Sequence, residues 1–134
     1  MDNIQAGVLN IRLKDINEIW DTRKKFAEMY DKGLDDCFFT LPTPQEGRVY
    51  QEYVIQVVDR LGLTEHLTQY GIEVLPSLKQ QTTGLKENHL LWSDKVLPET
   101  KLFTEQNLRL PIWPTLKEED IEYVITTIKN FYGV

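Results

Sequence analysis

The sequence is poor in the residues that build small disulfide-bonded and metal-stabilised proteins. Its 134 residues include one cysteine, Cys37, and two histidines, His66 and His89. A single cysteine excludes an internal disulfide and fits a reducing compartment. A structural zinc site takes four cysteine or histidine ligands, and this chain has only these three, far apart in sequence. A disulfide scaffold is therefore excluded, and no metal site is expected.

Long apolar runs and a basic surplus are also missing. No stretch is long enough to span a bilayer, and the segment Met1–Gln5 lacks the basic residues and apolar run of a signal peptide. Fifteen Lys and Arg stand against 21 Asp and Glu, which gives a net charge of −6. General nucleic-acid binders and proteins that bind anionic membranes need a basic face. We therefore expect one cytoplasmic domain over residues 1–134, with no nucleic-acid or membrane partner.

Residues 2–34 are expected to form one long helix, because the segment has no proline and carries a continuous apolar stripe. The stripe has helical spacings of four and three, with one polar interruption at Arg23. Its members are Leu9, Leu13, Ile16, Trp20, Arg23, Ala27, Tyr30 and Leu34. A second stripe of Ile4, Val8 and Ile11 covers only the first turns, so this end of the helix needs two partners. These three side chains are candidate interface residues, since exposed contiguous apolar surface usually marks an interface.

The rest of the chain alternates short strands and helices. Strands over 37–41 and 49–58 are expected to pair as an antiparallel hairpin. The other expected elements are a helix over 60–70 with Asp59 as its N-cap, a strand over 72–75, a helix over 99–105, a strand over 107–110 and a helix over 118–132. The helices over 60–70 and 118–132 should cover one face of a small, mainly antiparallel sheet. The pattern predicts a two-layer α+β fold.

The start of the last helix allows two local arrangements. Thr115 and Glu118 suit a capping box, in which each side chain accepts from a backbone N–H of the first turn. Alternatively, Leu116 and Ile121 suit a hydrophobic staple around Lys117. The sequence does not choose between them.

Five short segments follow one another in a family-like order. They are Asp2–Leu9 with Leu13–Ile16, Val49–Ile55 with Asp59–Arg60, Leu67–Glu73, Leu97–Phe103, and Leu110–Leu116 with Glu118–Val124. The first resembles the long helix that opens the C-terminal part of the DegT/StrS-type sugar aminotransferases, which depend on pyridoxal phosphate (PLP). The other four resemble, in order and spacing, the elements that follow in that family. The resemblance implies an inter-domain helix over 1–34 and a small α+β domain of PLP-transferase type over 35–134.

The segments that carry the chemistry of the family have no match in this chain. Family members hold the cofactor through a lysine followed by a Gly-Glu-Gly-Gly run, and none of the ten lysines here precedes such a run. All seven glycines are isolated, so a glycine-rich phosphate cradle is lacking. Many members also carry a loop with two histidines near the substrate, whereas Val74–Thr82 has none. The resemblance therefore implies PLP in full-length members but no cofactor bound by this chain alone.

Two hypotheses of different classes follow. In the first, the chain is the C-terminal domain of an enzyme that aminates a nucleotide-linked keto sugar for amino-sugar or surface-polysaccharide biosynthesis, and it is inactive alone. In the second, it is a stand-alone interaction module that self-associates or complements a separate large domain through the second stripe. A pocket lined by Trp92, Phe103 and Trp113 is a further alternative, although a plain core role for these aromatics is preferred. No catalytic, cofactor-binding or metal-binding residue is assigned.

Overall fold

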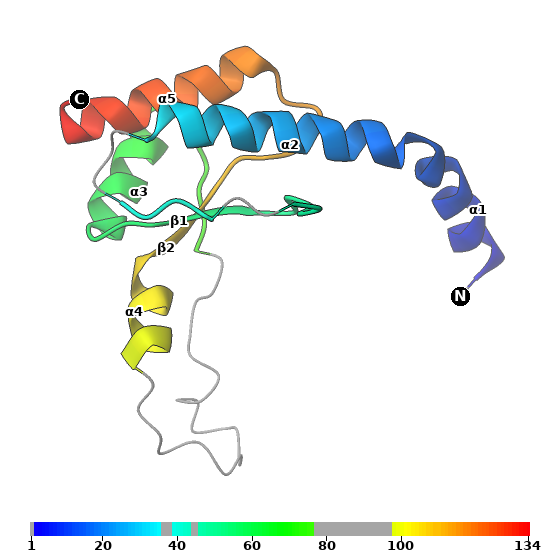
Figure 1. The fold of residues 1–134 in the computed structure, drawn as a ribbon, viewed down its shortest axis with the longest axis horizontal. Coiled ribbons are helices and arrows are strands. Elements are labelled where there is room, and N and C mark those ends of the chain that lie inside the picture. The colour runs from blue at the N-terminus through cyan, green and yellow to red at the C-terminus, as the bar shows by residue number, and fades with distance from the viewer. Residues whose placement is uncertain (1, 36–38, 44–45, 77–97) are drawn as a thin grey trace, which may run out of the picture.

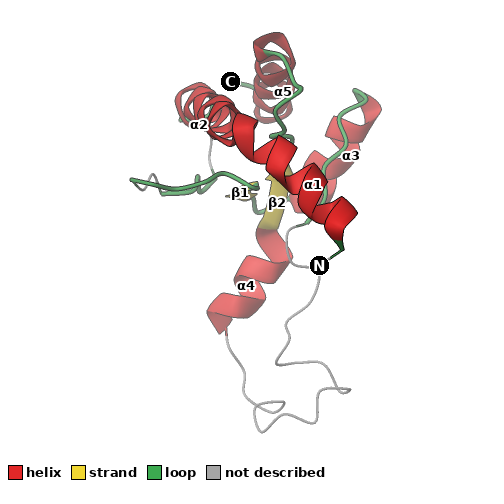
Figure 2. Cartoon of the chain, turned by 90° about the vertical axis from the view of Figure 1, so that its right-hand side faces the viewer, coloured by secondary structure: helices red, strands yellow, loops and turns green. Residues whose placement is uncertain are grey.

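The computed structural model describes residues 2–35, 39–43, 46–76 and 98–134. Its elements in chain order are α1 (Asn3–Arg12), a 3₁₀ turn (Leu13–Asp15), α2 (Ile16–Gly33), β1 (Tyr53–Gln56), α3 (Arg60–Gln69), α4 (Pro98–Gln106), β2 (Asn107–Leu110) and α5 (Glu118–Tyr132). Helices α2, α3 and α5 lie above the two strands in Figure 2, and α4 lies below them. The predicted α+β class, with a long N-terminal helical segment and a small antiparallel sheet, is confirmed.

The N-terminal helical segment has the predicted extent but not the predicted continuity. The expectation of one helix over 2–34 is wrong at Leu13–Asp15, where a 3₁₀ turn separates α1 from α2. Helix α2 buries Phe26, Ala27 and Tyr30, whereas α1 buries no residue and projects past the body in Figure 1. Tertiary packing supplies most of the stability of a helix in a protein. The body therefore holds α2 in place, whereas α1 buries no side chain against it.

The central strand β1 pairs mainly with β2, which is far away in sequence. Their antiparallel register places Tyr53 opposite Leu110 and Gln56 opposite Asn107. The expected hairpin between 37–41 and 49–58 is reduced, in the described residues, to one antiparallel bridge that joins Thr40 to Gln56. The hairpin prediction is therefore wrong about the main partner of β1, because it considered only the neighbouring strand in sequence.

The expected strand over 72–75 is likewise reduced to one bridge. Leu75 pairs with Arg109 of β2, and its carbonyl oxygen accepts from the Arg109 N–H at 2.8 Å. Ile72 and Val74 of the same segment are buried. The alternation of apolar and polar residues therefore predicts correctly that Ile72 and Val74 face the core. It does not predict a strand, because only Leu75 of this segment pairs with β2.

The three later helices follow the prediction closely. Asp59 caps α3, since its Oδ1 atom accepts from the Gly62 N–H at 2.9 Å. At α5 the N-cap is Lys117, whose N–H donates to the Asp120 carboxylate at 2.8 Å. The Thr115–Glu118 capping box is therefore wrong. Leu116 and Ile121 occupy the two staple positions around Lys117, and both join the core.

The core lies between α2, α5, α3 and the two strands. Its buried hydrophobic residues are Phe26, Ala27, Tyr30, Leu34, Tyr50, Tyr53, Ile55, Val57, Leu63, Leu67, Ile72, Val74, Leu108, Leu110, Ile112, Ile121, Val124 and Ile128. Helix α2 packs against α5, and α5 also packs against α3. The first apolar stripe is thus buried only from Ala27 onward, whereas its earlier members Leu9, Leu13 and Trp20 are exposed.

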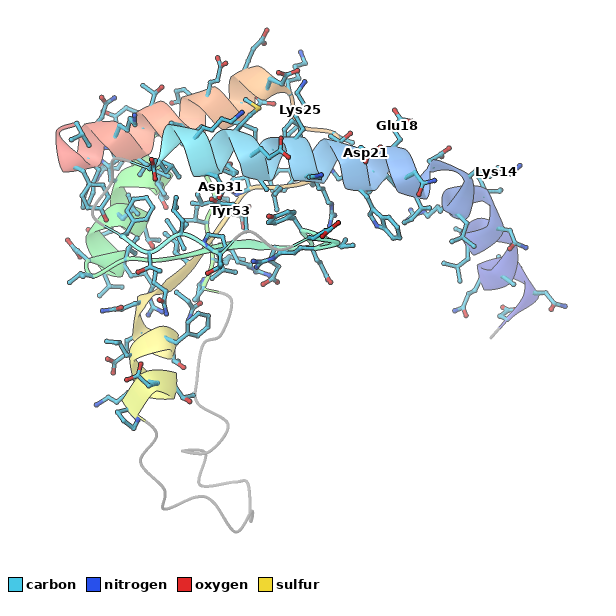
Figure 3. All side chains as sticks on the ribbon, viewed as in Figure 1. Lys14, Glu18, Asp21, Lys25, Asp31 and Tyr53 are labelled. Carbon is cyan, nitrogen blue, oxygen red and sulfur yellow. The ribbon has the colours of Figure 1, made fainter. Side chains whose placement is uncertain are left out.

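Two buried tyrosines join α2 to the sheet. The rings of Tyr30 and Tyr53 lie 4.9 Å apart. Tyr30 donates through its hydroxyl to the Pro111 carbonyl oxygen at 2.8 Å, and Tyr53 donates to Asp31 Oδ1 at 2.6 Å. Asp31 and Tyr53 face each other between α2 and β1 in Figure 3. Burial raises the pKa of the Tyr30 hydroxyl, and burial together with the Asp31 carboxylate raises the pKa of Tyr53.

These two shifts predict a loss of stability in alkaline solution. An unfolded tyrosine loses its proton near pH ~10, whereas the folded chain keeps both protons to higher pH. The stabilising contribution is therefore fully present below about pH 10 and is lost as the pH rises through the folded pKa values. Urea midpoints measured from about pH 8 to pH 11 should fall, and should fall less steeply in Tyr30→Phe. Equal slopes for the two proteins would contradict this assignment.

Candidate functional site

Helix α1 presents the three candidate interface residues to solvent. Ile4, Val8 and Ile11 are 76%, 48% and 66% exposed, and they share one face by their spacing of four and three. Leu9, on the opposite side of α1, and Leu13, in the 3₁₀ turn, are further exposed apolar side chains. The structure thus brings the three predicted residues together on one uncovered face. Their role in an interface stays a prediction.

Gly7 lies inside α1, where glycine is unfavourable. A glycine in a helix interior costs about 0.5–1 kcal/mol relative to alanine. A methyl group at Gly7 would meet no atom within 4 Å, so nothing in the described chain requires this glycine. Glycine is suited to positions where another surface approaches the backbone closely. The contacts within the described chain do not explain why position 7 is a glycine. A surface that covers α1 and approaches its backbone at Gly7 would explain it.

A groove of about 460 Å³ lies between α2, the sheet and the segment that follows β2. Its polar side chains are Arg23, Gln51, Glu52, Glu73 and Arg109, and Trp113 forms part of its wall. Arg109 Nη1 lies 2.5 Å from Glu52 Oε1, and both side chains are about one-third exposed. In the sequence, Arg23 is visible only as the polar interruption of the apolar stripe, and no pattern marks Arg109. The one sequence feature that could have indicated this groove is the charged residue on an otherwise apolar helix face.

Of the three aromatics named for a possible pocket, the structure describes Phe103 and Trp113. Trp113 lines this groove and a smaller neighbouring hollow of about 240 Å³. Phe103 lies on α4 and lines neither of them, and Trp92 lies outside the described residues. Phe103 and Trp113 therefore share neither of these two hollows, and a pocket that includes Trp92 stays a prediction.

The described histidine has structural contacts. His66 Nε2 lies 3.2 Å from the Thr127 carbonyl oxygen, and its ring packs against Tyr70 and Phe131. These contacts join α3 to α5. His89 and Cys37 lie outside the described residues. Within the described ranges, no three His, Cys, Asp or Glu side chains come close enough to hold a metal ion, and no helix is long and apolar enough to cross a bilayer.

The lysines of the described residues do not fit a covalent PLP site. Such a lysine is activated by removal from water or by a neighbouring cation. Lys24 and Lys25 are exposed, and Lys25 forms an ion pair with Glu118 at 2.6 Å. The other described lysines are also unburied. No catalytic step is therefore derived from these residues.

Comparison with known proteins gives a consistent result. Residues 1–129 match the model of the DegT/DnrJ/EryC1/StrS aminotransferase family. A "pleiotropic regulatory protein" of Geobacillus stearothermophilus is 31% identical over 98% of this chain and 37% of its own length. A dTDP-3-amino-3,6-dideoxy-alpha-D-galactopyranose transaminase of Aneurinibacillus thermoaerophilus is 25% identical over 99% of this chain and 37% of its own length.

A solved structure extends the likeness to three dimensions. The crystal structure of a DegT/DnrJ/EryC1/StrS aminotransferase from Brucella abortus superposes with a TM-score of 0.90 and 27% identity. The match covers 100% of this chain and 36% of that one. The chain thus spans little more than a third of the length of the relatives that it matches.

Proposed function

The chain belongs to the DegT/DnrJ/EryC1/StrS aminotransferase family, and on this premise we propose that it acts as the C-terminal domain of a cytoplasmic enzyme that aminates a nucleotide-linked keto sugar. The resemblance inferred from the five segments is confirmed. The observation that carries the proposal is the coverage: alignments over 98% and 99% of this chain take up only 37% of each of the two curated relatives. The amination would serve amino-sugar or surface-polysaccharide biosynthesis.

The family is PLP-dependent, and solved neighbours include one with bound PMP and one in a PLP form. In such enzymes PLP acts as the electron sink. Because the described lysines do not fit its covalent attachment, we assign the cofactor to a larger domain and expect this chain to be inactive without it. The contribution of the chain is then structural: it supplies a folded small domain and the helical segment over 1–34 that meets the larger domain.

The exposed face of α1 is the surface that we assign to this contact. Ile4, Val8 and Ile11 would otherwise remain in water, and burying apolar area contributes roughly 25 cal/mol per Å². Gly7 borders this face and lets a second backbone approach. The same face supports the second candidate function, an interaction module that forms a homo-oligomer or complements a separately encoded large domain.

The proposal is tested by reconstitution. The chain is mixed with the part of the Aneurinibacillus thermoaerophilus transaminase that it does not cover, and complex formation and PLP-dependent amino transfer are measured. We expect a complex and activity from the mixture but no activity from the chain alone. Amino transfer by the chain alone would overturn the assignment of the chemistry to a larger domain. A chain that forms only dimers and ignores the larger domain would instead favour the self-associating module.

A further inference from the structure

Arg23 is a half-buried cation without a counter-ion in the described residues. Its Nη1 atom donates to the Tyr50 carbonyl oxygen at 3.2 Å, while its Nε atom is enclosed and has no hydrogen-bond partner. Arg23 forms none of the ion pairs found within the described ranges. A guanidinium keeps its charge at any pH that proteins meet, and charges taken out of water are normally paired. Within the part of the chain that the structure describes, Arg23 therefore has no paired carboxylate and its Nε–H group has no acceptor.

The surroundings of Arg23 are those of a small-ligand site. The groove that Arg23 lines measures about 460 Å³, which falls in the range of about 300–1,000 Å³ for small-molecule sites. Leu110, Pro111 and Ile112 give it a largely apolar wall. Apolar walls lower the local dielectric and strengthen the attraction between a fixed charge and a ligand.

The other charges of the groove leave Arg23 as the dominant cation. Arg109 also lines the groove, but Glu52 already neutralises it through a contact of 2.5 Å. Glu73 is exposed and is the remaining carboxylate of the lining. The charges of Arg109 and Glu52 cancel each other, and water screens the exposed carboxylate of Glu73. The half-buried guanidinium of Arg23 therefore makes the groove favour an anionic ligand.

From these contacts we propose that the Arg23 groove binds a small oxyanion, a carboxylate or a phosphate group. The planar fork of arginine matches two oxygen atoms of such a group. The Nη2 atom of Arg23 donates no hydrogen bond within the described residues and is the donor that we assign to the ligand. Trp113 lines the same groove at 48% exposure and offers a flat apolar surface to the remainder of the ligand. None of the residues that line this groove belongs to the α1 face.

The test is a titration of the full chain with inorganic phosphate, and separately with succinate, at constant ionic strength. The NMR signal of the Arg23 Nε–H group, identified by its absence in Arg23→Gln, reports binding at the site itself. Calorimetry gives the affinity of each variant. We expect a saturable shift of this signal with at least one of the two anions, and Arg23→Gln should weaken binding by about tenfold or more. The anion that gives the tighter binding identifies phosphate or carboxylate as the natural ligand group.

Two further variants separate a site from a general charge effect. Glu73→Gln removes the like charge in the groove and should tighten binding severalfold, an effect that damage to the fold would not produce. Lys24→Gln removes one positive charge from the adjacent position of α2, which lines a different groove, and should leave the affinity unchanged. Equal weakening in Lys24→Gln and Arg23→Gln, weaker binding in Glu73→Gln, or no saturable shift with either anion would each overturn the proposal.

Discussion

Replacing Tyr30 with alanine is expected to lower the free energy of unfolding by about 3–5 kcal/mol, the usual cost of removing a large buried aromatic side chain. Tyr30 is fully buried, packs 4.9 Å from the Tyr53 ring and donates to the Pro111 carbonyl oxygen. The substitution removes the contact that holds α2 on the sheet and leaves the Pro111 acceptor without its donor. Since a domain of this size has a total stability of roughly 5–15 kcal/mol, much of that stability would be lost.

Urea unfolding followed by circular dichroism measures the effect. Tyr123→Ala is the matched control, because Tyr123 lies on α5 at 49% exposure and donates to the Tyr70 carbonyl oxygen at 3.1 Å. Its loss should cost no more than about 1 kcal/mol. Tyr30→Phe keeps the ring and should cost about 1–3 kcal/mol through the unsatisfied Pro111 carbonyl. Similar costs for Tyr30→Ala and Tyr123→Ala would contradict the anchoring role of Tyr30.

The elements that could be predicted from sequence are those with local signals. Asp59 and Gly71 mark the two ends of α3, and Gly71 has a φ of 75° at its end. Helix α5 has an apolar face of uninterrupted helical period, from which Ile121, Val124 and Ile128 are buried. Capping groups, left-handed glycines and periodic apolar faces act over a few residues. Their outcome does not depend on which distant segment packs beside them.

The features that were missed depend on distant partners. The choice of β2 as the main neighbour of β1 joins Tyr53 to Leu110, and nothing in either strand alone specifies that pairing. The break at Leu13–Asp15 has no proline or glycine to mark it, and the apolar stripe runs through it unchanged. Which part of the stripe meets the body is a tertiary property.

The candidate sites divide in the same way. The face of Ile4, Val8 and Ile11 was found from its period, because an amphipathic pattern with a second apolar side is visible in one helix. The Arg23 groove was not found, because it joins α2 to residues near β1 and β2 that are far apart in sequence. A cation on an otherwise apolar stripe indicates only that something polar faces it. The fold was needed to show which residues those are.

Replacing Ile11 with aspartate is expected to weaken binding of the chain to the larger domain by roughly a thousandfold, because an unpaired carboxylate would be buried in an apolar contact. Ile11 is 66% exposed and α1 buries no residue, so the free energy of unfolding of the chain itself should change by less than about 0.5 kcal/mol. A large effect on binding with no effect on stability is the signature of an interface residue.

Asn10→Asp supplies the matched control for that substitution. It adds the same charge to the neighbouring exposed position of α1, away from the face of Ile4, Val8 and Ile11, and should bind as the unmodified chain does. Hydrogen exchange gives a second measurement: α1 lacks buried residues, so its amides should exchange rapidly in the free chain and slowly in the complex. If Ile11→Asp bound as well as Asn10→Asp, the α1 face would not be the contact. If Ile11→Asp instead turned a dimer of the free chain into a monomer, the same face would serve self-association. The reason is that burial of an unpaired carboxylate is costly in any apolar contact that covers position 11.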